Sequence, residues 1–227
     1  MSTSLAELLR SVLPLALGAA VSPVILLLQM VTLTTGTSRL ARAWLVAAGA
    51  ALALAGWGLA GWLLVNRLPT PRVGPDATAA AVDLTLALVL VALGIRAVVG
   101  RHDPAPAPAA ADDDPASAPP RLLTAFGLGV AAMASNVTTI VLFLPAVRDI
   151  ARAEVATLDT VVALVVLFAV TLAPALLPVL AVSLGGAAGR RVLDRVGEFA
   201  RVHHAAIAAV VSFAFAVYLG LKGLQRL

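Results

Sequence analysis

Residues 133–145 read MASNVTTIVLFLP and place four polar side chains, Ser135, Asn136, Thr138 and Thr139, inside an otherwise apolar segment. Ser and Thr can bond back to the carbonyls of their own helix at little cost. The amide of Asn136 cannot be fully satisfied in that way. In lipid it needs another helix, a water molecule or a substrate. The stretch therefore predicts either a binding site within a membrane or a polar contact between helices.

The composition around this stretch is that of a membrane protein. Of the 227 residues, 61% are hydrophobic and 12% charged, and the mean hydropathy is +1.00. Each of the long apolar segments can span a hydrocarbon core of about 30 Å as a helix. We therefore expect an all-α polytopic membrane protein with six transmembrane helices at about 11–35, 42–65, 78–99, 122–147, 158–184 and 204–225.

Several kinds of chemistry are not expected from the residues present. The chain has no cysteine, which excludes disulfides and thiolate metal sites. Its three histidines, His102, His203 and His204, form no cluster with metal-ligand spacing. No nucleophile–base pair is visible. The net charge is +4, with arginines mostly at helix ends, where they set membrane topology. We expect no enzymatic activity, no catalytic residue, no metal, no cofactor and no nucleic-acid partner.

Two parts of the chain resemble each other. AAVSPV (19–24) and AMASNV (132–137) fall at matching places, as do LGIR (93–96) and LGLK (219–222). Three helices per copy require that the copies be inverted in the membrane, which is common in secondary transporters. We predict a 3+3 inverted repeat, although chance similarity among apolar helices is the alternative.

The predicted copies are joined by a linker. The first occupies residues 1–101 and the second 121–227. Between them, residues 102–120 read HDPAPAPAAADDDPASAPP, with no apolar period. This composition predicts a disordered tether without a site.

The polar residues of the first and fourth segments predict a substrate path between these two helices. Pro23 removes an N–H and should kink or unwind the first helix. The amides of Gln29 and Asn136 need partners within the membrane. The alternative is that both amides only join helices, with bonds worth about 1 kcal/mol. The predicted path residues are Ser22, Pro23, Gln29, Ser135, Asn136, Thr138 and Thr139.

Other residues of the predicted spans are candidates for a hinge and for proton coupling. Pro174 and Pro178 should bend the fifth helix strongly, as a hinge or as a static kink. Asp83 is a candidate for carrying a coupling proton. A position near the membrane interface, where its side chain reaches the headgroups, is the interpretation that we favour for Asp83.

Residues 189–204 form an amphipathic insert in the second copy. Apolar side chains share one arc of a helix and arginines fill the other. Such a helix lies at a membrane surface, so Arg190, Arg191 and Arg195 are expected to contact anionic headgroups. Packing of this helix on its own bundle is the alternative.

The arginine and lysine residues give an orientation. Nine lie on the side of the tether and seven, Arg148 among them, on the side of the termini. The positive-inside rule then places both termini outside the cytoplasmic membrane and the tether inside.

The chain resembles a known family. The matching stretches are LALGAAVSP (15–23), MASNVTTIVLFLPAVRDIARA (133–153), PALLPVL (174–180) and AVYLGLKGL (216–224). They are similar to the glycolipid-addressing, Sap-type membrane proteins of actinobacteria, within the lysine-exporter superfamily. The resemblance implies a role in moving cell-envelope glycolipids. Many superfamily members have Asn-Pro in the fourth helix, whereas Asn136 precedes Val137 here.

Two functions follow as hypotheses. The first is a small exporter that moves an envelope glycolipid or a small polar solute through a site between the first and fourth helices. The second is an accessory protein that does not transport and instead assists a larger lipid exporter. The expected partners are the bilayer and its anionic lipids, such an exporter, or a second copy of the chain.

Overall fold

The computed structural model describes residues 4–34, 38–67, 77–99 and 118–225. Within these ranges all regular secondary structure is α-helical, as the apolar segments predict. Most of the predicted tether, residues 102–117, lies outside the described residues. The helices are α1 (Leu5–Ala20), α2 (Pro23–Thr34), α3 (Arg39–Arg67), α4 (Ala77–Val99), α5 (Ala118–Ala134), α6 (Val137–Arg152) and α7 (Thr157–Leu224).

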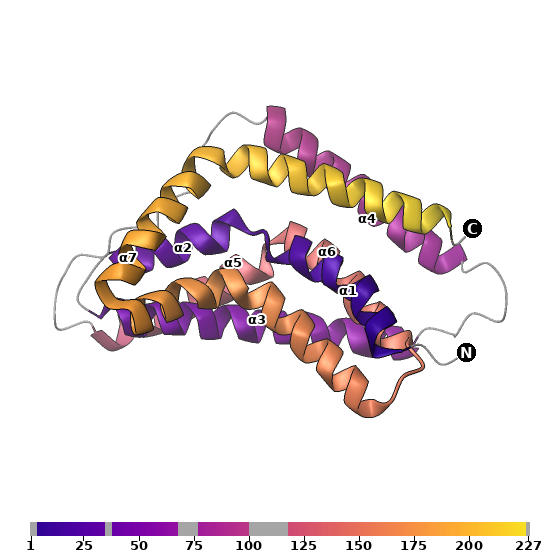
Figure 1. The fold of residues 1–227 in the computed structure, drawn as a ribbon, viewed down its shortest axis with the longest axis horizontal. Coiled ribbons are helices and arrows are strands. Elements are labelled where there is room, and N and C mark those ends of the chain that lie inside the picture. Colours follow the sequence, from indigo (N-terminus) through magenta and orange to yellow (C-terminus); the bar gives the residue numbers. More distant parts are fainter. Residues whose placement is uncertain (1–3, 35–37, 68–76, 100–117, 226–227) are drawn as a thin grey trace.

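Four helical stretches are long and apolar enough to cross a membrane. They are Arg39–Arg67, Ala80–Val99, Thr157–Gly186 and Ala205–Leu224. Two further spans are broken: α1 and α2 meet at 50°, and α5 and α6 meet at 68°. If each bent pair is one span, the described chain has six. The start of α1 and the end of α7 lie at the same end of the molecule, consistent with an even number of crossings (Figure 1).

The boundaries differ from the expected ones at both ends of the chain. The first helix starts at Leu5, earlier than expected, because Ser4 and Glu7 form a capping box ahead of it. The last two predicted helices are parts of the single element α7. Its backbone departs from helical geometry at Gly186, where φ is 51°. That positive φ is accessible to glycine without the strain that a side chain would cause.

The helices approach each other closely at small residues, and many of the large apolar side chains face outward. Gly49 of α3 and Gly129 of α5 bring the two backbones together, so that an added Cβ on either would collide with a carbonyl of the other helix. Inside, Phe143 and Phe168 pack edge to face with ring centroids 5.3 Å apart. Leu184 is 86% exposed and Leu88 is 70% exposed. Small residues inside and leucines outside are typical of helix packing in lipid.

Alanine substitution at two glycines of α5 tests the α3–α5 contact. Gly129→Ala should lower the stability by about 1–3 kcal/mol, because the new methyl group collides with the carbonyl of Val46. At Gly127, an added Cβ has open space among the described residues. Gly127→Ala should therefore be neutral or stabilising, because alanine favours helix. Thermal unfolding in detergent micelles measures both, and equal melting temperatures would contradict the close contact.

Candidate functional site

The two broken helices touch each other at their breaks. The amide nitrogen of Asn136, between α5 and α6, donates to Ser22 Oγ, between α1 and α2, over 2.6 Å. Thr139 Oγ1 adds a second link, donating to the carbonyl of Ala19 over 3.0 Å. The structure thus brings together polar residues that lie 114 positions apart in the chain.

Each break is a helix start as well as a helix end. Ser22 Oγ accepts from the N–H of Ile25 over 3.4 Å, and Asn136 Oδ1 accepts from the N–H of Thr139 over 3.2 Å. Both side chains therefore cap the half-helix that follows them. Pro23 is the first residue of α2, where its missing N–H leaves no donor to satisfy. The sequence predicts that the helix kinks or unwinds at Pro23, and the structure shows that α1 ends before it and α2 begins there.

This arrangement places two helix N-termini next to each other, those of α2 and α6. A helix N-terminus carries a partial positive charge and free N–H groups. Broken membrane helices point such ends at anionic substrate groups in transporters. The junction of the breaks is therefore suited to hold an anionic or hydrogen-bond-accepting group.

Gln29 lies away from this junction and joins three helices. Its amide nitrogen donates to the carbonyls of Ala43 in α3, over 3.1 Å, and Ala175 in α7, over 2.9 Å. The side chain is fully buried. Its Oε1, like the Oγ1 of Thr171, has no hydrogen-bond partner among the described residues. Gln29 therefore joins helices, as the alternative to a substrate path predicts. Its Oε1 remains available as a hydrogen-bond acceptor.

Ser135 and Thr138, two further predicted path residues, take no part in the hydrogen bonds between the two breaks. Ser135 is exposed, and its hydroxyl donates to Ala131 of its own helix over 2.7 Å. Thr138 is half-buried. The structure therefore assembles Ser22, Asn136 and Thr139 into one bonded group.

The predicted hinge of the fifth helix does not interrupt α7. The backbone stays helical through Pro174 and Pro178, and the non-helical conformation falls at Gly186. The sharp change of direction is at a glycine because a proline constrains φ, whereas Gly186 adopts a positive one.

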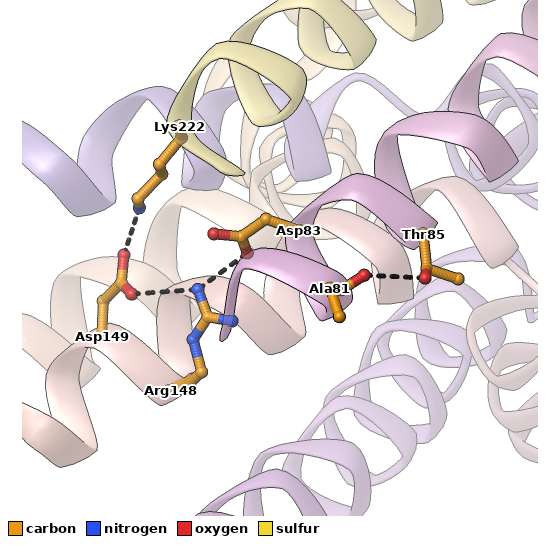
Figure 2. A network of polar contacts seen from close by, with 6 residues as sticks. All are labelled: Ala81, Asp83, Thr85, Arg148, Asp149 and Lys222. Atoms are coloured by element: carbon orange, nitrogen blue, oxygen red, sulfur yellow. Dashed lines mark hydrogen bonds and ion pairs between the residues drawn. The ribbon is translucent and has the colours of Figure 1, made fainter. Parts of the chain in front are cut away.

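A cluster of charged side chains lies at the end of the bundle where α4 begins and α6 and α7 end. Arg148 Nη2 donates to Asp83 over 2.8 Å and to Asp149 over 3.5 Å. Lys222 binds the other oxygen of Asp149 over 2.5 Å. Figure 2 shows the guanidinium of Arg148 between the two carboxylates, with Lys222 reaching in from α7.

Asp83 lies near the start of α4, and only the expected reach of its side chain to the headgroups is contradicted. Its side chain is 0% exposed and paired, so it does not reach out toward headgroups. Arg148, taken only as a topology signal, is 8% exposed. The sequence did not indicate the pair because its members lie 65 residues apart. A buried charge of this kind persists because its partner compensates the loss of water.

The amphipathic insert forms the part of α7 that follows Gly186. Arg191 and Arg195 are exposed, whereas Leu193 between them is buried. The side chain of Arg190 lies outside the described residues. In the described ranges, no group of three or more His, Cys, Asp or Glu is placed to hold a metal ion.

Removal of one charge tests the cluster. Arg148→Gln should destabilise the protein by about 3–5 kcal/mol, because it leaves the carboxylate of Asp83 buried without its cation. Asp83→Asn combined with Arg148→Gln should cost less than the two single changes added together. Arg10→Gln, at an exposed arginine of α1, is the control and should be near neutral. Thermal unfolding is measured for the two single variants, the double variant and the Arg10→Gln control. Identical melting temperatures of Arg148→Gln and Arg10→Gln would count against a buried pair.

Comparison with known proteins identifies the family. No curated protein and no solved structure matches the chain. A family model described as "Sap, sulfolipid-1-addressing protein" matches residues 12–225. The match includes both helix breaks and the whole charged cluster, so the chain belongs to the Sap (sulfolipid-1-addressing protein) family.

Proposed function

We propose that the protein moves an anionic envelope lipid across the cytoplasmic membrane, along a path between the broken helices α1/α2 and α5/α6. The observation that carries the proposal is the direct bond between the two breaks, from Asn136 to Ser22. Meeting helix breaks are the usual substrate sites of inverted-repeat transporters. The family's description favours a sulfolipid or a related glycolipid over a small polar solute.

A 3+3 inverted repeat is part of the same proposal. In each half, a bent helix pair is followed by two unbroken spans. The capping roles of Ser22 and Asn136 correspond between the halves. The unit of repetition is then 1–101 and 121–227, with residues 187–204 as an addition in the second half. Both termini lie outside and the tether inside, by the arginine and lysine count.

The substrate class agrees with the electrostatics of the junction. The N-termini of α2 and α6 supply partial positive charge where the breaks meet. A sulfate or phosphate oxygen can replace Ser22 Oγ as the acceptor of the Asn136 amide. The bond between the breaks then opens when the headgroup binds and closes when it leaves.

The accessory role is the second candidate, and the charged cluster favours it. Its two carboxylates, Asp83 and Asp149, are matched by Arg148 and Lys222. A cluster whose charges balance can stay buried without a further ion, which suits a static scaffold for a larger lipid exporter, or for a second copy of the chain.

Two measurements together decide between these functions. Loss of an envelope lipid from the outer surface in a deletion strain shows that the protein is needed for export. Purified protein in liposomes should then move a fluorescent anionic lipid between leaflets. A deletion phenotype without lipid movement in liposomes would support the accessory role.

Three substitutions test the role of the junction in that function. Ser22→Ala and Asn136→Ala should each reduce export by about tenfold or more, because each removes the Asn136–Ser22 hydrogen bond and leaves only the link from Thr139 to Ala19. Each also removes a helix cap, at a cost of about 1 kcal/mol, which the fold should tolerate. Ser135→Ala is the matched control, since that hydroxyl bonds only its own helix.

Export is followed by lipid analysis of a complemented deletion strain, with protein levels measured in the same membranes. Full export by Asn136→Ala would show that Asn136 is not part of the substrate path. Loss of export accompanied by loss of the protein itself would assign it a structural role.

Labelling of an added cysteine tests the orientation. The native chain has none, so Ala110→Cys places a single thiol in the tether. A membrane-impermeant maleimide should leave this thiol unlabelled in intact cells and label it after lysis. Labelling in intact cells would reverse the proposed topology.

A further inference from the structure

The stretch of α7 between its two spans lies where a membrane surface must be. One apolar span ends at Gly186 and the next begins at Ala205. The positive φ of Gly186 turns the chain out of the first span, and residues 187–204 continue as helix. In Figure 1 this stretch crosses one end of the molecule before the final yellow helix runs back along it. We call residues 187–204 the surface helix.

One face of the surface helix packs on the bundle. Leu193 is buried in a small cluster with Leu33 of α2 and Val179 of α7. One turn later, Gly197 lies against Met30, so that an added Cβ would be 3.3 Å from Met30 Cγ. The alternative of packing on the bundle is therefore correct for this face.

A second face is apolar and remains exposed. Val192, Val196 and Phe199 are 58%, 43% and 59% exposed. Their spacing places them on one stripe, about a quarter of a turn away from Leu193 and Gly197. His203 extends the stripe, with its ring stacked on Phe199 at a centroid distance of 4.5 Å. Exposed apolar side chains on a helix between two spans are suited to the acyl-chain boundary of a membrane surface.

The third face is charged. Arg191 and Arg195 are exposed. They lie next to the apolar stripe, on the side away from Leu193. Over residues 187–204 the arginines outnumber the acidic residues by two, with Glu198 on the same side as the two exposed arginines. A shallow hollow lies at the border of the charged and apolar faces, lined by Arg195, Glu198, Phe199, Val202 and His203.

We infer that the border of these two faces binds the headgroup of an anionic lipid. The guanidinium groups of Arg191 and Arg195 would contact its phosphate or sulfate oxygens, for which a planar fork of donors is suited. The stripe of Val192, Val196 and Phe199 would lie along its upper acyl chains. A free anion can use only the first set of contacts, whereas a lipid uses both.

This site is connected to the helix break through α2. The surface helix packs on Met30 and Leu33, in the last turns of the half-helix that Ser22 caps. A lipid that fixes the surface helix therefore restrains α2. The binding itself does not depend on the proposed transport, and it is tested by a separate measurement.

The test uses the full chain, purified in detergent and mixed with equal amounts of phosphatidylglycerol and phosphatidylcholine. Native mass spectrometry then counts the lipids that stay bound. The wild type should retain phosphatidylglycerol preferentially. Arg191→Gln with Arg195→Gln should weaken that binding by about thirty-fold, because each arginine near a membrane surface contributes about fivefold. Arg191→Lys with Arg195→Lys keeps the charges but loses the planar fork of donors, so it should retain more phosphatidylglycerol than the double Gln variant and less than the wild type.

Two further arms separate a lipid from a free anion. Phe199→Ala should reduce retention severalfold although it changes no charge, and millimolar inorganic sulfate should not displace the lipid. Displacement by sulfate, or unchanged retention in Phe199→Ala, would overturn the lipid assignment in favour of a simple anion site. Unchanged phosphatidylglycerol retention in the double Gln variant, at an unchanged melting temperature, would remove the arginines from any site.

Discussion

Lipid offers no hydrogen bonds, so a helix that breaks inside a membrane must find partners for the groups that the break frees. In this chain the two breaks provide each other's partners. Asn136 caps its own half-helix with its oxygen and binds Ser22 with its nitrogen, and Thr139 binds the carbonyl of Ala19. Neither broken helix satisfies its side chains without the other. The two halves are therefore joined at their breaks by direct hydrogen bonds.

The helix α6 is held at both ends as a result. Asn136 ties its start to the α1/α2 break, and Arg148, about 18 Å further along, ties its last turns to Asp83 of α4. One short helix therefore carries both the junction contact and a member of the charged cluster.

The sequence predicted most of the helical spans because length and hydropathy determine what can cross a bilayer. It also indicated the two breaks, since Ser22, Pro23 and Asn136 are polar or helix-ending residues in apolar surroundings. It could not indicate that Asp83 pairs with Arg148, because pairing depends on tertiary contact between distant segments. The sequence did not indicate the bend at Gly186, because Pro174 and Pro178 are stronger local signals for a helix bend. In the structure both prolines lie within continuous helix. For Gln29, the sequence could not distinguish a substrate-path residue from an amide that joins helices. That distinction depends on its contacts with Ala43 and Ala175, which lie in two other helices.

The close approach of Gly49 and Gly129 has a consequence for biosynthesis. The two glycines lie on opposite sides of the tether, so α3 enters the bilayer well before α5 has been translated. Until then Gly49 lacks the α5 backbone that it packs against in the folded protein. The same holds for α1 and α4, whose partners α6 and α7 also come from the second half. The contacts that complete the packing of the first three spans therefore form only after helices of the second half have been translated.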